Sequence, residues 1–283
     1  MTFPVRDSRI GYHRASYVIP EKRMSVARIG FALLFCSTLA FAQAQKAPAP
    51  DYQPNIGQEG KDVVWVPTPQ VLVDKMLDMA KVTPADFLMD LGSGDGRTVI
   101  TAAKRGVRAL GIEYNPDMVA LSRRNAEKEG VASRATFEQA DLFETDFSKA
   151  TVITMFLLPE INLKLRPKIL QLKPGTRVVS NSFTMGEWKE DERAEISAKQ
   201  GCKESWCTAL LWIVPARVAG THKIPQGEVT LKQEYQMLSG FLRANDGKSY
   251  ALKGKVNGEE VVFTAGGREY RGRFNAGRLE IKS

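Results

Sequence analysis

Hydrophobic and polar residues follow two different patterns along the chain. Between about Val71 and Val214, short apolar runs of strand length alternate with amphipathic stretches of helix length. The predicted strands are residues 87–90, 107–113, 135–139, 151–156 and 176–182, and the predicted helices are residues 69–80, 97–105, 116–129 and 160–172. Such alternation predicts a parallel sheet covered by helices on both faces. We therefore expect an α/β fold with a Rossmann-like, doubly wound sheet over residues 62–219.

From Gly220 onward the pattern changes. Residues 226–283 carry short runs of alternating polar and apolar residues, and no stretch there has the periodicity of a helix. Glycine-containing turns separate the runs at Asn245-Asp246-Gly247, Asn257-Gly258, Gly266-Gly267 and Asn275-Ala276-Gly277. The pattern predicts a meander of about six strands. Residues 220–283 are therefore expected to form a small all-β domain, either a sheet or a barrel.

The first 42 residues have the segment order of a secretory signal peptide. An uncharged stretch over residues 29–42 follows two arginines and ends in Ala-Phe-Ala, and Met24 just before it is a possible true start. The stretch is shorter than the ~20 apolar residues that span a membrane, and no second apolar run follows. We expect cleavage after Ala42 or Ala44, an Ala/Pro-containing linker over residues 43–61, and no membrane span in the mature protein. The expected location is periplasmic or secreted, or cytoplasmic if the segment is not a signal peptide.

Composition places the chain among globular proteins. It has 283 residues, of which 43% are hydrophobic and 25% charged, and its formal net charge is +8. Residues 1–42 contain six basic and two acidic residues, so the remainder carries +4. This excess contains no run of five like charges, and we therefore expect no nucleic-acid partner.

The cysteine content predicts one disulfide and no metal site. Removal of the signal peptide also removes Cys36, which leaves Cys202 and Cys207 as an even pair at a spacing that suits a small closed loop. The only histidines, His13 and His222, are far apart in sequence, and no second cysteine pair completes a tetrahedral metal site.

The most informative motif is Asp90-Leu91-Gly92-Ser93-Gly94-Asp95-Gly96-Arg97, between the first predicted strand and the next helix. Alternate glycines allow a ligand to approach the backbone, and the helix N-terminus beyond them offers free N–H groups. The spacing is not that of the G-x-G-x-x-G dinucleotide fingerprint, because the third glycine comes one residue early. A carboxylate at Asp90 would repel a pyrophosphate. It suits a ligand with a cationic amino-acid group, such as S-adenosylmethionine.

Two more acidic residues follow the next predicted strands. Glu113 ends the second strand, where a carboxylate can accept hydrogen bonds from both ribose hydroxyls. Asp141 follows the third strand, where a carboxylate can accept the adenine amino group while Leu142 packs on the ring. With the glycine loop, they predict an S-adenosylmethionine site made of Asp90, Gly92, Ser93, Gly94, Gly96, Glu113, Asp141 and Leu142.

Over roughly residues 62–215, the sequence resembles class I, seven-strand methyltransferases that use S-adenosylmethionine. More narrowly, it resembles the family of the mitochondrial ATP synthase c-subunit lysine N-methyltransferase and its bacterial relatives. The matching stretches are Val66-Pro67-Thr68-Pro69, residues 90–97, Gly111-Ile112-Glu113, Asp141-Leu142-Phe143, Phe156-Leu157-Leu158-Pro159, Asn162-Leu163-Lys164-Leu165-Arg166-Pro167 and residues 173–180. The resemblance implies lysine N-methylation of a protein substrate. It also implies that Pro67 and Thr68 close over the methionine end of the cofactor and that residues 156–159 line the methyl-transfer pocket.

Two positions depart from the family pattern. Phe156 stands where the family usually has Tyr, and Asn181-Ser182-Phe183 stand where it has His-Asp-Phe. No catalytic residue is therefore assigned, and Phe156, Pro159 and Phe183 are the candidates for the substrate pocket. The alternative is an exported, non-catalytic binding protein that retains the methyltransferase fold, because S-adenosylmethionine is made in the cytosol. A nicotinamide-dependent enzyme is disfavoured by the glycine spacing.

Overall fold

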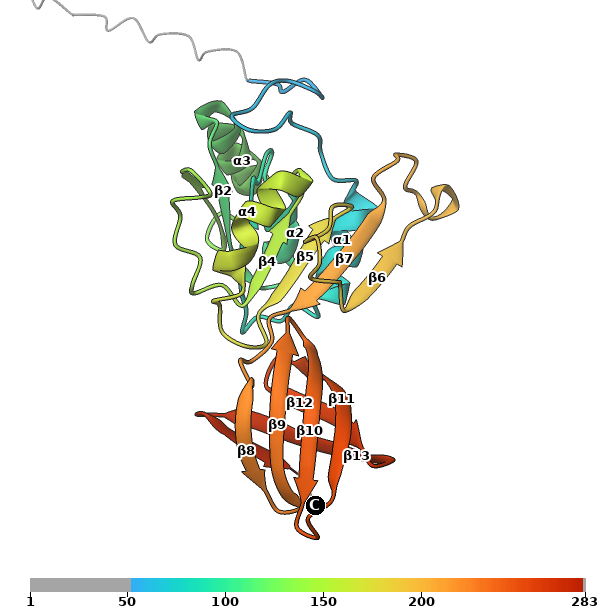
Figure 1. Cartoon of the computed structure of the whole chain (residues 1–283). Helices are drawn as coiled ribbons and strands as arrows, with labels where there is room; N and C mark the ends of the chain where they lie inside the picture. The colour runs from blue at the N-terminus through green and yellow to red at the C-terminus, as the bar shows by residue number, and fades with distance from the viewer. Residues whose placement is uncertain (1–51, 282–283) are drawn as a thin grey trace, which may run out of the picture. The chain divides into compact units, whose positions relative to one another are not determined.

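The computed structural model describes residues 52–281 (Figure 1). The predicted signal peptide, its cleavage sites and residues 43–51 of the predicted linker lie outside the described residues. Within residues 52–281, no helix is both long and apolar enough to cross a membrane.

The first sheet has seven strands in the order β3-β2-β1-β4-β5-β7-β6. Their bounds are Phe87–Leu91 for β1, Arg108–Glu113 for β2, Ala135–Gln139 for β3, Val152–Met155 for β4, Arg177–Asn181 for β5, Glu192–Glu195 for β6 and Thr208–Ile213 for β7. Strands β1 to β5 run parallel to one another, whereas β7, between β5 and β6, is antiparallel to both. The prediction of a Rossmann-like, doubly wound seven-strand sheet is confirmed. The strand order reverses between β1 and β4, which is where such sheets bind ligands.

The four predicted helices all form, with ends within three residues of those predicted. They are α1 over Gln70–Met79, α2 over Arg97–Lys104, α3 over Pro116–Lys128 and α4 over Pro159–Ile169. Helix α3 begins with a strong cap, because the Asn115 side chain accepts the backbone N–H of Asp117 at 2.9 Å and Pro116 takes the first helical position. This cap fixes the turn between β2 and α3, which carries part of the site described below.

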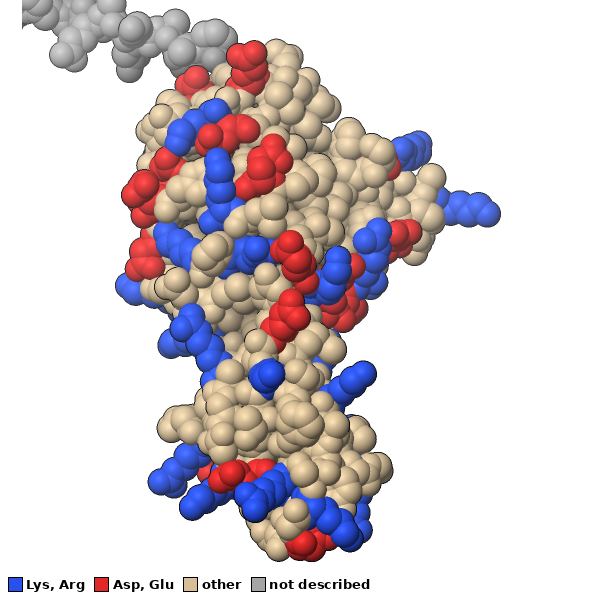
Figure 2. Space-filling model, in the orientation of Figure 1, with Lys and Arg blue, Asp and Glu red and all other residues tan. Residues whose placement is uncertain are grey.

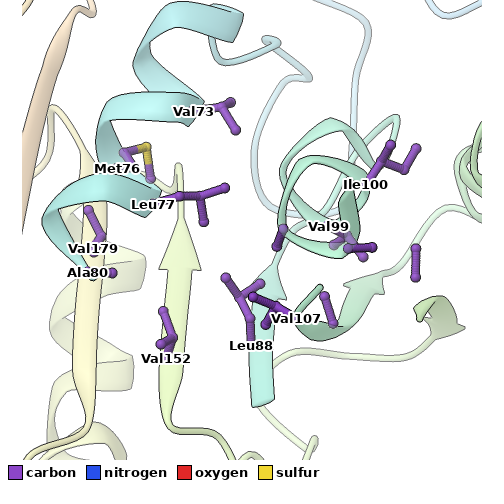
Figure 3. Close-up of a cluster of buried hydrophobic side chains, with 14 of the residues drawn as sticks. Val73, Met76, Leu77, Ala80, Leu88, Val99, Ile100, Val107, Val152 and Val179 are labelled. Carbon is purple, nitrogen blue, oxygen red and sulfur yellow. The ribbon is translucent and has the colours of Figure 1, made fainter. Parts of the chain in front are cut away.

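The two faces of the sheet carry separate hydrophobic clusters. One contains side chains of α1, α2 and α3 packed on the sheet, and Figure 3 shows its centre around Leu77, Leu88 and Val99. The other lies on the face covered by α4 and contains Met89 and Leu91. Successive residues of β1 therefore enter opposite clusters, as the two-residue period of a strand requires. Full burial of each such side chain contributes about 1.5–3 kcal/mol of transfer free energy.

The C-terminal residues form a second sheet, of seven antiparallel strands in chain order. The strands are β8 over Gly220–Ile224, β9 over Gly227–Glu234, β10 over Met237–Ala244, β11 over Ser249–Asn257, β12 over Glu260–Ala265, β13 over Arg268–Asn275 and β14 over Arg278–Ile281. Strand β14 also lies beside β8, and a third hydrophobic cluster fills the interior. The all-β prediction is confirmed, and the six strands expected in residues 226–283 are β9 to β14, with β8 preceding them. The additional strand β8 is short and mostly polar, so it has little hydrophobic alternation to reveal it.

Candidate active site

A pocket lies at the carboxyl ends of β1, β2 and β4, where the strand order reverses. Its lining includes nine of the residues that the sequence singled out: Thr68, Asp90, Gly92, Ser93, Gly94, Glu113, Asp141, Leu142 and Phe156. Three others, Gly96, Pro159 and Phe183, are not part of the lining. The carboxyl ends of neighbouring parallel strands meet at one edge of the sheet. That arrangement brings the three acidic residues around one cavity.

The glycine loop has left-handed backbone at Gly92, Gly94 and Gly96, with φ of 78°, 53° and 83°. A Cβ on Gly94 would come within 2.6 Å of the Trp65 indole nitrogen, so a side chain there would displace the opposite wall of the pocket. A Cβ on Gly96 would instead meet the Phe137 ring at 2.7 Å. Gly96 therefore allows close packing against Phe137 of β3, and the ligand contact that the sequence suggested for it stays a prediction.

Asp90 is a buried carboxylate that no basic side chain of the described chain neutralises. Only 6% of its surface is exposed, and the Thr154 hydroxyl donates a hydrogen bond to Oδ1 at 2.6 Å. Burial raises the pKa of Asp90 to about 7, and the nearby carboxylates of Glu113 and Asp95 add to this effect, whereas the Thr154 hydrogen bond opposes it. A cationic ligand in the pocket would supply the missing positive charge.

Glu113 joins the glycine loop to the start of α3. Its Oε2 accepts the backbone N–H of Gly94 at 2.9 Å, and its Oε1 accepts that of Asn115 at 3.0 Å. An ionised carboxylate has about four acceptor positions, so these two bonds leave capacity for further donors. Glu113 can therefore hold the loop and still accept the hydroxyls of a ribose.

Asp141 forms an ion pair with Lys61, whose ammonium also lies 4.9 Å from the centre of the Tyr114 ring. The hydrogen bond from Lys61, and then that from the backbone N–H of Phe143, lower the pKa of Asp141 below its usual value. Lys61 belongs to residues 58–68, which form one wall of the pocket. Residues 58–61 fall in the predicted linker, and nothing in their sequence indicated this contact with the site.

The wall is held by its own backbone. The N–H of Gly57 donates to the carbonyl of Trp65 at 2.8 Å, and the N–H of Trp65 donates to the carbonyl of Gln58 at 2.9 Å. Both ends of the loop are thus tied together, and its outer part depends on the pair of Lys61 and Asp141. Thr68 and Pro67 follow directly and also line the pocket.

This arrangement fits S-adenosylmethionine. The uncompensated buried carboxylate of Asp90 suits an ammonium group, and the spare acceptor positions of Glu113 suit paired hydroxyls. The oxygens of Asp141, next to Leu142 in the lining, suit an amino group on a flat ring. A pyrophosphate would meet three carboxylates here, which disfavours a dinucleotide.

Beyond Phe156 lies a second group of aromatic side chains. The Phe156 and Phe183 rings stack with centroids 5.9 Å apart, and the Trp206 ring lies 6.5 Å from Phe156. All three side chains are half-buried. Phe156 thus separates the pocket from an aromatic surface that includes Phe183. Trp206 was missed in the sequence, because only folding brings its loop to Phe156.

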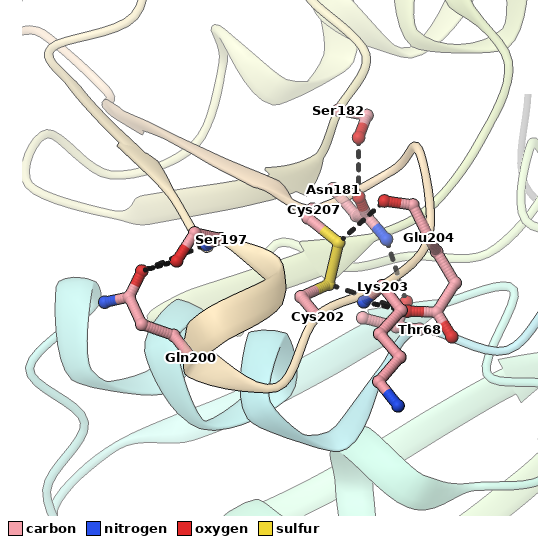
Figure 4. Close-up of a disulfide and its surroundings, with 9 residues drawn as sticks. All are labelled: Thr68, Asn181, Ser182, Ser197, Gln200, Cys202, Lys203, Glu204 and Cys207. Atoms are coloured by element: carbon pink, nitrogen blue, oxygen red, sulfur yellow. Dashed lines mark hydrogen bonds between the residues drawn. A yellow bond between two sulfur atoms is a disulfide. The ribbon is translucent and has the colours of Figure 1, made fainter.

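A polar chain connects this region to the pocket. The Ser182 hydroxyl donates to Asn181 Oδ1 at 2.8 Å, and Asn181 Nδ2 donates to Thr68 Oγ1 at 3.3 Å (Figure 4). Ser182 has left-handed backbone, with φ of 60°, a conformation that is costly for a residue with a side chain. The Asn-Ser pair therefore occupies a constrained turn beside the site.

Helix α4 holds the loop that carries Phe183. Asn162 Nδ2 donates to the carbonyl of Phe183 at 3.2 Å and to that of Thr184 at 3.3 Å. Arg166 Nη1 donates to the carbonyl of Met185 at 2.8 Å. Asn162 is fully buried, so these bonds are shielded from water. The Asn162–Arg166 part of the family-like segment thus has a positioning role that the sequence did not reveal.

Cys202 and Cys207 form a disulfide that closes the loop before β7 (Figure 4). Trp206 lies inside this closed loop, next to Cys207. Ligand atoms of Cys202, Glu204 and Cys207 lie within 4.8 Å of one another, but the two sulfurs are bonded to each other and are not thiolate ligands.

Comparison with known proteins gives one family and several close relatives. The model of the ANTKMT methyltransferase domain matches residues 90–192. A protein-lysine N-methyltransferase of Saccharolobus islandicus is 47% identical over 133 residues, which are 46% of this chain and 83% of that protein. The human ATP synthase c-subunit lysine N-methyltransferase is 36% identical over 128 residues, so that 45% of this chain spans about half (54%) of that relative.

A solved structure is equally similar. The crystal structure of an RNA methyltransferase from Salinibacter ruber, in complex with S-adenosyl-L-homocysteine, is 48% identical and has a TM-score of 0.50. The match covers 54% of this chain and 96% of that one.

Proposed function

We propose that this chain, which belongs to the ANTKMT methyltransferase family and is an S-adenosylmethionine-dependent methyltransferase, methylates lysine side chains of a protein. The observation that carries the proposal is the buried, uncompensated carboxylate of Asp90 in the same pocket as Phe156, whose ring stacks on that of Phe183. The first feature suits a cationic cofactor. The second suits an aliphatic amine, which is the acceptor in the relatives named as lysine methyltransferases.

The roles of the pocket residues follow from their chemistry. Asp90 would bind the ammonium of the methionine moiety, Glu113 the ribose hydroxyls and Asp141 the adenine amino group. Asp141 must exchange its contact with Lys61 for the one with adenine, or share its oxygens between them. Thr68 and Phe156 lie in the lining between these groups and the aromatic surface. When bound, S-adenosylmethionine supplies a methyl group activated by its sulfonium.

The protein contributes position and desolvation. Side chains that hold two reactants in line can contribute roughly 7–11 kcal/mol toward the barrier. A lysine has a reference pKa of about 10.4 and must lose its proton before it can attack. Contact with Phe156 and Phe183 removes water from the amine and so favours its neutral form. No general base is required, which is consistent with Asn181-Ser182 in place of an acidic pair.

Charge distribution favours a protein acceptor over RNA. Residues 52–219 contain 22 Lys+Arg and 22 Asp+Glu, whereas residues 220–283 contain 11 and 7. Figure 2 shows both signs interspersed over the first of these parts. A surface without a basic excess offers little counterion release on binding a polyanion. The Salinibacter relative, named an RNA methyltransferase, makes RNA the second acceptor to test.

The test is a labelling experiment with the full chain. Tritiated S-adenosylmethionine is added to an envelope-protein extract and, separately, to total RNA, with Asp90→Ala as the inactive control. We expect label in protein, on methyl-lysine identified by mass spectrometry, and none with the variant. Label in RNA alone would reject the lysine assignment. The third outcome, binding of S-adenosylhomocysteine without any transfer, would favour the non-catalytic alternative, for which the comparisons give no support.

We also propose that the protein is exported. The uncharged stretch over residues 29–42, with its Ala-Phe-Ala end, supports this proposal, as does the disulfide of Cys202 and Cys207. N-terminal sequencing of the protein from its native cells is the test. A mature N-terminus at Gln43 or Gln45 in the extracytoplasmic fraction is expected, whereas an intact N-terminus in the cytosolic fraction would contradict export.

A further inference from the structure

We propose that Trp206 completes, with Phe156 and Phe183, an aromatic pocket for the alkyl-ammonium side chain of the acceptor, and that the disulfide of Cys202 and Cys207 holds Trp206 in place. The proposal rests on the proposed lysine methylation and adds a residue that determines which acceptor binds.

The geometry brings three rings from three parts of the chain together. Phe156 follows β4, Phe183 follows β5, and Trp206 comes just before β7. The two phenyl rings are nearly parallel, at 20°, while the indole is tilted by 36° to Phe156. The three side chains are half-buried, so each retains some accessible surface. Since Phe156 also lines the cofactor pocket, a side chain bound by these rings would end next to that pocket.

Aromatic faces bind ammonium and methylammonium groups through the ring quadrupole, and Trp is the strongest of them. They also stabilise the positive charge that appears on nitrogen as the methyl group is transferred, and this attraction partly offsets the desolvation that favours the neutral amine before transfer. Among these three residues, Phe156 lines the pocket, and Phe183 and Trp206 adjoin it through their contacts with the Phe156 ring. Their chemistry therefore matches an amine acceptor and its methylated product.

A second observation also points to a ligand. The indole N–H of Trp206 is buried and has no hydrogen-bond partner in the described chain. Buried donors are nearly always paired, so an unpaired one beside a binding surface is able to take a partner from outside the described chain. A carbonyl oxygen of the acceptor backbone would satisfy this group. Trp206 can thus recognise both the acceptor side chain and the chain that carries it.

The disulfide explains how an exposed loop can present a fixed indole. Lys203, Glu204 and Ser205 are exposed, but Cys202 and Cys207 are buried and covalently joined, with Cα atoms 6.0 Å apart. Trp206 lies next to one end of this bridge. Cleavage of the bridge would release one side of the loop and increase the conformational freedom of Trp206.

The test follows the indole signals by NMR in the ¹⁵N-labelled full chain saturated with S-adenosylhomocysteine. The chain has four tryptophans, and Trp206→Phe identifies the signal of Trp206 by its disappearance. The probe is Nα-acetyl-trimethyl-lysine methylamide, with the norleucine analogue as the neutral control. We expect a saturable shift of the Trp206 signal, with binding of the cation at least about threefold tighter than that of the neutral analogue.

Two variants test the positioning. Trp206→Ala, and the double variant Cys202→Ser with Cys207→Ser, should each weaken probe binding severalfold while leaving the affinity for S-adenosylhomocysteine unchanged. Trp206→Phe should retain part of the probe affinity, because it keeps an aromatic face. An unchanged affinity for the probe in Trp206→Ala would overturn the proposal.

The outcomes separate this proposal from the proposed function. If the chain is saturated with S-adenosylhomocysteine and the probe does not shift the Trp206 signal, the proposal of the aromatic pocket is overturned and the proposed function is not. Failure of the folded chain to bind S-adenosylhomocysteine would remove the proposed function and this inference with it. A shift caused by uridine at lower concentration than the amine would assign the rings to an RNA base and reject the amine pocket.

Discussion

Thr154 donates its hydroxyl hydrogen to the carboxylate of Asp90 at 2.6 Å, across the register that pairs these two residues in neighbouring strands. Among the described side chains, Thr154 is the hydrogen-bond donor to this buried carboxylate at the point of strand reversal. The folded protein thus contains an acid whose charged form is poorly stabilised until a cation binds. Cation binding requires the ionised form of Asp90, whereas that form lowers the stability of the cofactor-free protein.

Asp90→Asn should stabilise the cofactor-free protein. The amide has the same shape and can still accept from Thr154, but it carries no charge to desolvate. In the wild type, the folded pKa is raised above the unfolded one, so stability is lost as the pH rises from about 4 to the folded value of about 7. The difference in unfolding free energy between Asp90→Asn and the wild type should increase from about pH 4 to about pH 7 and stay constant above it. At 1.36 kcal/mol per pKa unit, it is on the order of 2–4 kcal/mol.

Thermal unfolding at pH 5 and pH 8 measures this effect. The gain in Tm should be larger at pH 8, at about 2–4 °C for each kcal/mol. The same variant should lose its affinity for S-adenosylmethionine. Equal Tm values at pH 8 for wild type and variant would contradict the raised pKa of Asp90.

Binding of S-adenosylmethionine should depend on pH with a maximum near pH 7–8. Below a pH of about 7, Asp90 must release its proton to bind the ammonium, so affinity should fall by up to about tenfold per pH unit. Above pH 8, the amino group of the ligand itself loses its proton, since its reference pKa is about 7.7–8.0. Calorimetry in buffers of different ionisation enthalpy measures the proton released. A flat profile from pH 5.5 to 7.5 would argue against a contact between Asp90 and the ammonium.

Glu113→Gln should weaken cofactor binding by about 10–100-fold, the effect of losing one charge-assisted hydrogen bond. The amide has a single acceptor oxygen, so it cannot accept from both Gly94 and Asn115 and also from a ribose. Asp117→Asn, which changes an exposed carboxylate in the next helix, is the matched control and should bind normally. Titration calorimetry measures both. Wild-type affinity in Glu113→Gln would mean that ribose is bound elsewhere.

Lys61→Met should speed both association and release of the cofactor. The variant keeps much of the aliphatic side chain but removes the ion pair with Asp141 and the contact of the ammonium with Tyr114. The pocket wall over residues 58–68 then loses its outer attachment. Stopped-flow fluorescence of Trp65, which lies in that wall, measures both rates. A change in the equilibrium constant with an unchanged release rate would show that the pair does not restrain the wall.

Asn162→Ala should raise the KM for the acceptor severalfold and leave the affinity for the cofactor unchanged. The variant removes both donors that hold the carbonyls of Phe183 and Thr184. Glu160→Gln, at an exposed position in the same helix, serves as the control. Steady-state kinetics with the acceptor protein, once it is identified, give the KM for the acceptor separately from the affinity for the cofactor. A parallel loss of cofactor affinity would instead indicate a general disturbance of the fold.

Sequence alone predicted the parts of the molecule in which a local pattern determines the structure. The parallel strands followed from apolar runs, and Asp90, Glu113 and Asp141 followed because acids at successive strand ends meet at one edge of a sheet. Lys61, Trp206 and the bonding role of Asn162 were not predicted. Each depends on a contact between segments 21 to 80 residues apart in the chain, as in Lys61 with Asp141, and no local periodicity encodes such a contact.

The assignment of Gly96 illustrates the same limit. The sequence placed it among ligand-binding glycines, and the structure adds a packing role, because its missing Cβ makes room for Phe137 and Ser122. A glycine required for helix packing and one required for a ligand look identical in a motif. Only the neighbours across the sheet distinguish them.

The sheet has two parts, which come from successive segments of the chain: the parallel strands β1 to β5, and then the antiparallel pair β6 and β7 at one edge. Every strand on the cofactor side belongs to the parallel part of the chain, and the antiparallel pair of β6 and β7 arrives as one contiguous hairpin with its bridged loop. A single exchange of the stretch from residue 182 to residue 207 would therefore replace Phe183 and Trp206 together and leave the strands of the cofactor site intact. If Phe183 and Trp206 select the acceptor as proposed, one contiguous segment carries that selection, separate from the strands that carry the cofactor site.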